Sequence, residues 1–231
     1  MKLVLFDIDG ILLYKKRASG YNEWDIIAKK HFGTGITTMG YVSGFTDRRV
    51  LLERLKNSGL KIRASDKRLD RAMRDLGPEI ARAIRTGRLA VRKVPGVEKL
   101  ARKLAAEGLI LGLLTGNVYG KARAKLRAAG LWEYFKAGAF GASTTDRSKL
   151  VAIAMRDAGR KTGVRFRKGD VFLIGDTAKD IEAARKGGVR IIAVATGHES
   201  LEQLKKEKPD YAFKDFSGAN AAKIVEALRR P

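Results

Sequence analysis

The chain lacks cysteine altogether and has only two histidines, His31 and His198, among its 231 residues. A disulfide framework, a thiolate zinc site and a cysteine nucleophile are therefore excluded, and so is a metal site built from several histidines. No apolar stretch approaches the ~18 uninterrupted residues of a membrane span. Acidic residues follow the first apolar run too early, at Asp7 and Asp9, for a secretory signal. We expect a soluble, cytoplasmic protein.

Acidic residues are scarce relative to basic ones. The chain holds 48 Lys and Arg against 25 Asp and Glu, a net charge of +23. The excess is spread evenly, with +12 in residues 14–93 and +12 in residues 94–231, so there is no basic tail. We interpret it as solvated helix faces. The alternative is a field that attracts anions, from phosphorylated metabolites to nucleic acid, but no nucleic-acid-binding signature accompanies the charge.

Strand and helix patterns alternate over most of the chain, which predicts an α/β protein with a parallel sheet. The predicted strands cover residues 2–8, 109–114, 137–141, 170–174, 189–195 and 210–213. The predicted helices that follow them cover residues 97–107, 119–129, 147–161, 178–187, 199–207 and 217–229.

Residues 14–93 show no convincing strand. Helices are predicted over 21–32, 46–57 and 65–86, with Pro78 dividing the last of them into two. We therefore expect an α/β core formed by residues 1–13 and 94–231, and an all-helical insert that forms a cap domain over residues 14–93.

Polar residues follow three of the predicted strands. The sequence Asp7-Ile8-Asp9-Gly10 ends the first strand, and Thr115-Gly116-Asn117 ends the second. Gly175-Asp176-Thr177 ends the fourth, with Asp180 in the first turn of the next helix. Parallel sheets bind ligands at the carboxyl ends of their strands, so these side chains are expected at one edge.

Several carboxylates at one edge would repel one another. At ~4 Å and an effective dielectric constant near 20, each pair of like charges costs about 4 kcal/mol. A cation would relieve that repulsion, and oxygen ligands without His or Cys favour Mg²⁺ over zinc. Such a site is typical of phosphoryl transfer.

The order of these motifs resembles the haloacid dehalogenase-like hydrolase superfamily. Further segments are similar to its phosphoglycolate-phosphatase-like branch, namely Gly44-Phe45-Thr46-Asp47, Phe140-Gly141, Asp146-Arg147 and Thr196-Gly197. The resemblance implies a Rossmann-like parallel sheet with helices on both faces and an inserted all-helical cap. Relatives often carry a lysine where this chain has Phe45, which weakens the case for phosphoglycolate itself.

The resemblance also implies roles for individual residues. Asp7 would be the nucleophile, and Asp9 the general acid and base, with a pKa raised by burial and a neighbouring carboxylate. Thr115, Gly116 and Asn117 would bind the phosphoryl group.

The resemblance further implies residues that bind the metal and residues that neutralise the phosphoryl group. Mg²⁺ would be held by Asp7, the Asp9 carbonyl and Asp176, with Asp180 binding or orienting a metal water. Arg147 would neutralise the phosphoryl oxygens, with Lys149 as the alternative.

The function expected from the sequence is a Mg²⁺-dependent phosphatase for a small phosphorylated metabolite. A sugar phosphomutase or a nucleotide phosphatase of the same fold stays open, as does a basic nucleic-acid-binding protein. The sequence indicates no oligomeric state.

Overall fold

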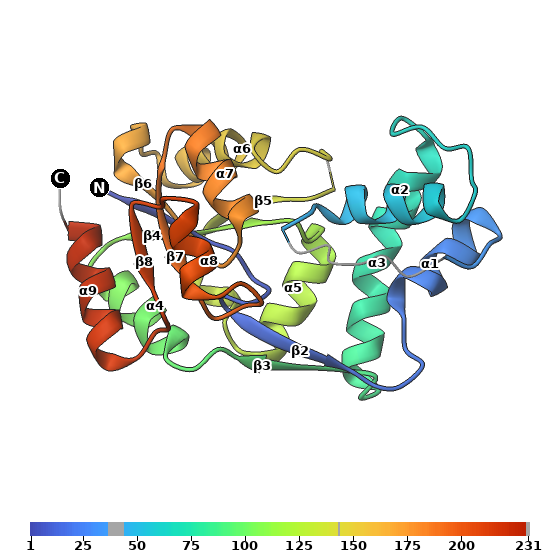
Figure 1. The fold of residues 1–231 in the computed structure, drawn as a ribbon, viewed down its shortest axis with the longest axis horizontal. Coiled ribbons are helices and arrows are strands. Elements are labelled where there is room, and N and C mark those ends of the chain that lie inside the picture. The colour runs from blue at the N-terminus through green and yellow to red at the C-terminus, as the bar shows by residue number, and fades with distance from the viewer. Residues whose placement is uncertain (37–43, 143, 230–231) are drawn as a thin grey trace.

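A wholly parallel sheet of six strands forms the centre of the molecule (Figure 1). The structure is a computed structural model that describes residues 1–36, 44–142 and 144–229. Side by side, the strands are β5 (Ala137–Phe140), β4 (Ile110–Thr115), β1 (Leu3–Phe6), β6 (Val171–Gly175), β7 (Arg190–Val194) and β8 (Tyr211–Phe213). The predicted strands are confirmed, and β1 lies between the two strands whose ends carry the other polar motifs.

Helices cover both faces of the sheet because the side chains of each strand point alternately to either side. Val4 and Phe6 of β1 pack on one face, and Leu3 and Leu5 pack on the other. The helices of the first face are α4 (Val97–Ala106), α5 (Tyr119–Ala128) and α9 (Gly218–Arg229). The helices of the second face are α6 (Lys149–Thr162), α7 (Ala178–Gly187) and α8 (Leu201–Lys206). The short 3₁₀ turns η1 (Trp132–Tyr134) and η2 (Lys168–Asp170) precede β5 and β6.

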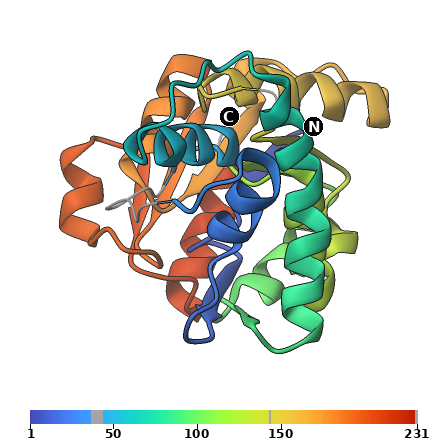
Figure 2. The ribbon, with the colours of Figure 1, turned by 90° about the vertical axis from the view of Figure 1, so that its right-hand side faces the viewer.

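Residues 14–93, called the insert below, interrupt this alternation between β1 and α4. They contain α1 (Glu23–Phe32), α2 (Asp47–Asn57) and α3 (Lys67–Arg85). Apolar side chains from all three helices, among them Trp24, Leu51 and Leu76, share one buried cluster. Figures 1 and 2 show these helices gathered at the side of the molecule opposite both termini.

Two strands at the ends of the insert differ from the sequence expectation. β2 (Leu13–Arg17) and β3 (Leu89–Lys93) form an antiparallel pair in a stretch where no strand was predicted. Each has a single buried residue, Leu13 or Leu89, at its start. The alternation of apolar and polar residues that reveals a strand in a sequence is therefore missing, and backbone pairing alone defines the two-stranded sheet.

The prediction that Pro78 divides a helix is wrong, because α3 runs through it from Lys67 to Arg85. A proline inside a helix costs about 3 kcal/mol. The apolar face on either side of it offsets that cost, since each fully buried Leu or Ile contributes about 1.5–3 kcal/mol. Leu69, Leu76 and Ile80 are all fully buried, while Pro78 itself faces solvent.

Helix α3 of the insert crosses α5 of the sheet layer at a pair of glycines. A Cβ on Gly77 would lie 2.7 Å from the Cα of Gly120, and one on Gly120 would lie 2.9 Å from the Cα of Gly77. Both approaches are closer than real Cβ contacts. The missing side chains therefore allow the two backbones to touch, and this contact holds the insert against the core.

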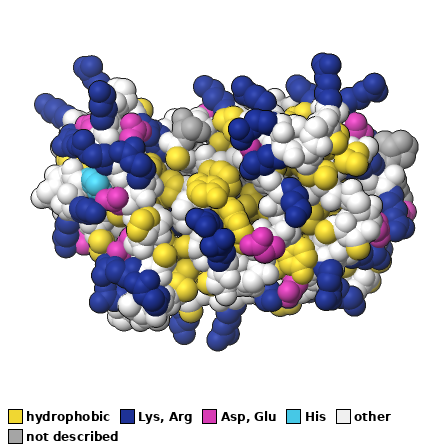
Figure 3. Space-filling model, turned by 180° about the vertical axis from the view of Figure 1, so that it is seen from behind, with side chains coloured by type: hydrophobic (Ala, Val, Ile, Leu, Met, Phe, Trp, Pro, Cys, Tyr) yellow, Lys and Arg dark blue, Asp and Glu magenta, His cyan; other side chains and the backbone are white. Residues whose placement is uncertain are grey.

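Lys and Arg side chains are scattered over the surface rather than gathered in one patch. Figure 3 shows them distributed around the rear face, with apolar side chains exposed between them. No helix in the described part of the chain is long and apolar enough to cross a membrane.

We expect Gly77→Ala to destabilise the fold by about 1–3 kcal/mol, because its methyl group would overpack a backbone that cannot move aside. Helix propensity acts in the opposite direction, since alanine is favoured over glycine by about 1 kcal/mol. Urea denaturation would measure the difference. Gly169→Ala is a matched control, since nothing lies within 4 Å of its added Cβ. If Gly77→Ala were as stable as the wild type, the close crossing of α3 and α5 would be contradicted.

Candidate active site

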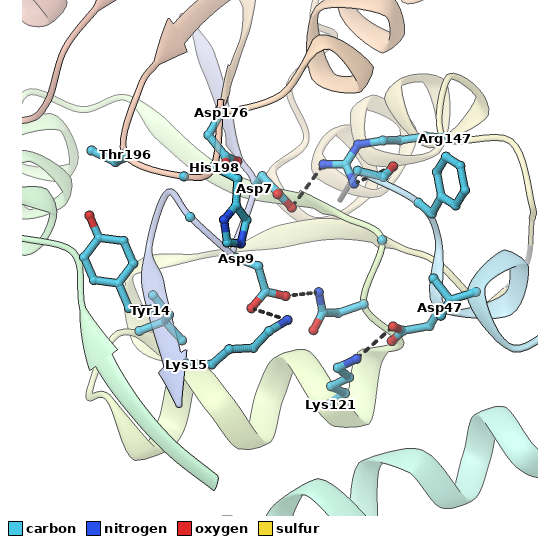
Figure 4. Close-up of a pocket in the computed structure, with 18 of the residues that line it drawn as sticks. Asp7, Asp9, Tyr14, Lys15, Asp47, Lys121, Arg147, Asp176, Thr196 and His198 are labelled. Atoms are coloured by element: carbon cyan, nitrogen blue, oxygen red, sulfur yellow. Dashed lines mark hydrogen bonds and ion pairs between the residues drawn. The ribbon is translucent and has the colours of Figure 1, made fainter. Parts of the chain in front are cut away.

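Three neighbouring strands deliver their polar residues to one edge of the sheet, as the sequence predicted. Asp7 follows β1, and its N–H donates to the carbonyl oxygen of Ile174 at 3.0 Å. Thr115 is the last residue of β4, and Asp176 follows β6. Asp7 and Asp176 are nearly inaccessible to solvent, and Thr115 is completely so. Figure 4 shows both carboxylates above the cavity that opens at this edge.

Asp7, Asp176 and Asp180 form a compact carboxylate cluster. One oxygen from each lies within 4.8 Å of the others, and all three side chains are buried. Asp180 is held by the N-terminus of α7, where its Oδ2 accepts from the Thr177 hydroxyl at 2.7 Å. The same oxygen accepts from the Thr177 N–H at 3.2 Å, and Thr177 Oγ1 accepts from the Asp180 N–H, which together form a capping box. The helix start thus aims the second carboxylate oxygen of Asp180 at the cluster.

Arg147 lies between two of these carboxylates. Its Nη2 is 3.1 Å from Asp7 Oδ1 and donates to Asp180 Oδ1 at 2.5 Å. Burial alone would lower the pKa of Arg147, but the two carboxylates raise it, so the guanidinium stays charged. Lys149, the alternative from the sequence, is an exposed residue at the start of α6. The structure therefore brings Arg147, rather than Lys149, to Asp7.

The cluster carries more negative charge than its surroundings compensate. Burial raises the pKa of Asp7 to about 6, opposed by Arg147 and reinforced by Asp180. Burial, followed by Asp180 and Asp7, raises the pKa of Asp176 well above its usual range. Both shifts show that a positive charge is needed at this point if the three carboxylates are to be ionised together.

The surroundings of Asp176 fit a metal ligand. Its Oδ1 is buried without a hydrogen-bond partner. A Cβ on Gly10 would lie 2.2 Å from Asp176 Oδ2, and one on Gly197 would lie 1.6 Å from it. The two glycines thus leave room for the carboxylate and for a ligand beside it. Gly10 has a φ of +91°, which glycine adopts without strain. Carboxylate oxygens are the donors that a hard divalent cation prefers.

Asp9 is held apart from this cluster by a different set of cations. Lys125 Nζ donates to both of its carboxylate oxygens, at 2.7 and 2.8 Å, and Lys15 Nζ lies 3.4 Å away. Burial alone would raise the pKa of Asp9, but Lys125, Lys15 and Lys121 hold it well below its usual range. The expectation of a raised pKa for Asp9 is therefore wrong. Sequence reasoning considered the carboxylate neighbour but missed the lysines.

Lys121 and Lys125 are the site residues that the sequence analysis overlooked. They lie one turn apart on α5, and both are buried. The sequence contained evidence for their burial, because the two lysines are four residues apart, as are Ala122 and Leu126, which mark the buried face of the same helix. Lysines beside the buried face of a helix require an anionic partner.

Asn117 and Thr115 connect the second strand end to Asp9. Asn117 Nδ2 donates to Asp9 Oδ2 at 2.9 Å and to Thr115 Oγ1 at 3.1 Å, while its Oδ1 accepts from Lys125 at 2.8 Å. The side chain that the sequence assigned to substrate binding is thus engaged in positioning Asp9. Gly116 lines the cavity beside it.

The insert enters the site through residues 44–48. Thr46 is the N-cap of α2. Asp47 does more than complement the helix dipole, because its N–H donates to Gly116 O at 2.7 Å. Its carboxylate accepts from Val118 N–H at 2.8 Å and from Lys121 Nζ at 2.9 Å. A side chain of the insert thus caps a helix of the core.

The resulting cavity of about 560 Å³ lies between the strand ends and the insert. Its core side is lined by Asp7, Asp9, Asp176 and Arg147, with His198 exposed beside them. Its insert side is lined by the cations Lys15, Arg17 and Arg54 and by the aromatic residues Tyr14, Trp24 and Phe45. The cavity therefore combines a buried carboxylate cluster with a basic and aromatic wall (Figure 4).

The chain is similar to known hydrolases. The model of a hydrolase family, described as haloacid dehalogenase-like hydrolase, matches residues 1–188. A "Probable phosphatase IndB" of Dickeya dadantii is 27% identical over 226 residues, which cover 93% of this chain and 90% of that protein. A phosphoglycolate phosphatase of Synechococcus elongatus is 26% identical over 177 residues, 76% of either chain.

A solved structure has the same fold. It is that of a predicted phosphoglycolate phosphatase from Haemophilus somnus, with a TM-score of 0.65 and 20% identity. The match covers 97% of each chain. The family resemblance and the α/β fold expected from the sequence are thereby confirmed.

The wall of the cavity contains a half-buried ion pair, with Glu23 buried and Arg17 partly exposed, that predicts a pH dependence of stability. Arg17 donates from Nε to Glu23 Oε2 at 2.8 Å and from Nη2 to Oε1. Burial alone would raise the pKa of Glu23, but Arg17 and Lys121 lower it from 4.5 to about 2. The pair therefore stabilises the fold fully above pH 4.5 and loses its effect as the pH falls towards 2.

We expect the wild type to lose on the order of 2 kcal/mol more stability than Glu23→Gln between pH 5 and pH 2. The neutral amide removes the group whose protonation differs between the folded and unfolded states. Urea unfolding of both proteins across this range would measure the difference. Parallel stability curves would contradict the depressed pKa.

Proposed function

The chain belongs to the haloacid dehalogenase-like hydrolase family, and from this premise we propose that it is a Mg²⁺-dependent phosphatase for a small phosphomonoester. The observation that carries the proposal is the buried cluster of Asp7, Asp176 and Asp180 with Arg147 at its side. The phosphatase names of its relatives support the same reaction class.

Asp7 would act as the nucleophile. One of its carboxylate oxygens attacks phosphorus while the bond from phosphorus to the ester oxygen breaks, which leaves an aspartyl-phosphate. Water then attacks the phosphorus, releases inorganic phosphate and restores Asp7. Arg147 would stabilise the phosphoryl oxygens, because its guanidinium already lies 3.1 Å from Asp7 Oδ1.

Asp9 would give a proton to the departing ester oxygen and take one from the attacking water. The lysines around it keep it ionised in the free protein, which is the form that accepts a proton. A phosphoryl dianion arriving beside it would favour the protonated form that the first step needs.

Asp7, Asp176 and Asp180, with the Asp9 carbonyl, would hold Mg²⁺, which when bound neutralises the carboxylates and the phosphoryl oxygens. Residues 1–13 and 94–231 would then form the catalytic core. The insert, residues 14–93, would act as a cap that covers the cavity and contacts the leaving group.

The basic wall of the insert further suggests the kind of leaving group. Arg17, Arg54 and Lys15 line the cavity. Two acidic side chains of the insert lie beside them, and each is paired, Asp47 with Lys121 and Glu23 with Arg17. A leaving group with its own negative charge suits this wall better than a neutral sugar does.

We expect Asp7→Asn to lower phosphatase turnover by more than about 1,000-fold, since the amide is not a nucleophile. Excess chelator should abolish wild-type activity, and added Mg²⁺ should restore it. Release of inorganic phosphate, measured over a panel of phosphomonoesters, tests both and separates hydrolysis from isomerisation of a phosphosugar. Asp25→Asn, which removes a carboxylate paired with Lys29 on the insert surface, is the control and should keep full activity. Full turnover in Asp7→Asn would overturn the mechanism.

We expect Arg54→Gln to raise KM by about tenfold for phosphomonoesters with a carboxylate in the leaving group. This is the change expected from the loss of one charge-assisted hydrogen bond. KM for esters with neutral leaving groups should stay within about twofold. Arg71→Gln, on the exposed surface of α3, is the matched control. An equal change for both ester classes would argue against an anion-binding wall.

A further inference from the structure

Lys125 is a fully buried cation whose hydrogen-bonding capacity is satisfied at the site. Its side chain has no exposed surface. Its ammonium makes three hydrogen bonds, two to the carboxylate oxygens of Asp9 and one to Asn117 Oδ1, all between 2.7 and 2.8 Å. An ammonium has three donors, so each donor has an acceptor.

Such a residue is poorly explained by stability alone. Removing an ammonium from water costs several kcal/mol, and a buried ion pair often does no better than apolar side chains of the same volume. The pair is also formed with the side chain proposed as acid and base, rather than with a carboxylate elsewhere on the surface.

The charges of the site are arranged in two separate groups. Arg147 contacts Asp7 and Asp180, which belong to the carboxylate cluster. Lys125 and Asn117 hold Asp9, which does not belong to that cluster. Asp9 is only two residues from Asp7, yet its carboxylate is engaged by Lys125 and Asn117 and takes no part in that cluster.

We propose that Lys125 is a positioning residue that holds the Asp9 carboxylate on the leaving-group side of the cleft, away from the carboxylate cluster. The proposal rests on the proposed function, because it assumes that Asp9 serves the ester oxygen. In the first step the Asp7–phosphorus bond forms, the phosphorus–ester oxygen bond breaks, and the proton passes from Asp9 to that oxygen. Lys125 keeps its three protons throughout and acts through the location of Asp9.

Two substrates with different leaving groups distinguish a role of Lys125 through Asp9 from a merely structural role. p-Nitrophenolate departs without being protonated, whereas an alkoxide needs a proton from Asp9. The comparison uses kcat/KM, which reports the steps up to phosphoryl transfer and excludes the later hydrolysis of the aspartyl-phosphate. The two substrates are p-nitrophenyl phosphate and the alkyl phosphomonoester that the wild type hydrolyses fastest.

We expect Lys125→Met to lower kcat/KM by about 100-fold for the alkyl ester, the lower end of what a general acid contributes. For p-nitrophenyl phosphate the loss should be under about fivefold, since no acid is required there. Arg127→Met is the control, because it removes an exposed cation from the same helix. Its kcat/KM for both esters should stay within about twofold of the wild type. The same factor for both esters in Lys125→Met would overturn the proposal.

A double-variant cycle with Asp9→Asn separates the inference from the function on which it rests. If Lys125 acts through Asp9, adding Lys125→Met to Asp9→Asn should change the alkyl-ester kcat/KM by less than about threefold. A further loss as large as that of Lys125→Met alone would exclude a role through Asp9. Wild-type activity in Asp9→Asn would instead refute the proposed function. Loss in Asp9→Asn but not in Lys125→Met would refute the inference alone.

The folded state of each variant is checked by circular dichroism and urea unfolding. If Lys125→Met does not fold, Lys125→Gln replaces it, since glutamine keeps one donor for Asp9 without the charge. The alkyl ester should then lose more activity than p-nitrophenyl phosphate by at least about tenfold. Equal losses for the two esters would again overturn the proposal.

Discussion

The convergence of four aspartates on one edge of a parallel sheet is the constraint on which the rest of the structure depends. Strand order alone places Asp7 and Asp9 beside Asp176 and Asp180, and their mutual repulsion would oppose folding unless cations accompany them. The chain supplies these cations from two different segments. The loop before α6 brings Arg147 to the cluster, and α5 brings Lys125 to Asp9. Asp7 and Asp180 thereby share Arg147, while Asp176 keeps a buried oxygen without a hydrogen-bond partner.

The same constraint explains why the insert is joined so closely to the core. Asp47 of α2 caps the N-terminus of α5, the helix that carries Lys121 and Lys125, so the insert contributes to placing both lysines. A Cβ on Gly116 would lie 2.1 Å from Phe45 O, which leaves no space between this strand end and the insert. The contact of Gly77 with Gly120 holds the same N-terminal end of α5 against α3. The attachment of the insert and the charge balance in the core therefore depend on one shared helix.

How much the sequence revealed differs between the backbone and the side-chain contacts. The sheet and its polar strand ends followed from apolar runs and turn residues, which are local signals. The course of α3 through Pro78 did not, because burial of its apolar face outweighs a local penalty. Strand β2 was missed because its register depends on β3, more than seventy residues later. The pKa of Asp9 was misjudged for the same reason, since its sign is set by Lys125, a distant residue in the sequence. Contacts between charged side chains that are far apart in the sequence cannot be predicted from local sequence patterns.

The basic side chains of the chain fall into a buried group and an exposed group, which act differently. Lys121, Lys125 and Arg147 are buried and neutralised by aspartates, so they contribute little to the field outside the protein. The remaining excess lies on exposed side chains that are scattered over the surface, as Figure 3 shows for one face. A scattered charge raises the local concentration of small anions around the whole molecule, whereas a nucleic acid requires a continuous basic track. Because the cavity wall of the insert has the same sign, an anionic ester attracted to the surface would meet a favourable potential on its way to the carboxylates, whose charge Arg147 and a divalent cation together would neutralise. On the proposed function, the basic surface and the acidic centre would thus act on the same anionic substrate at different distances.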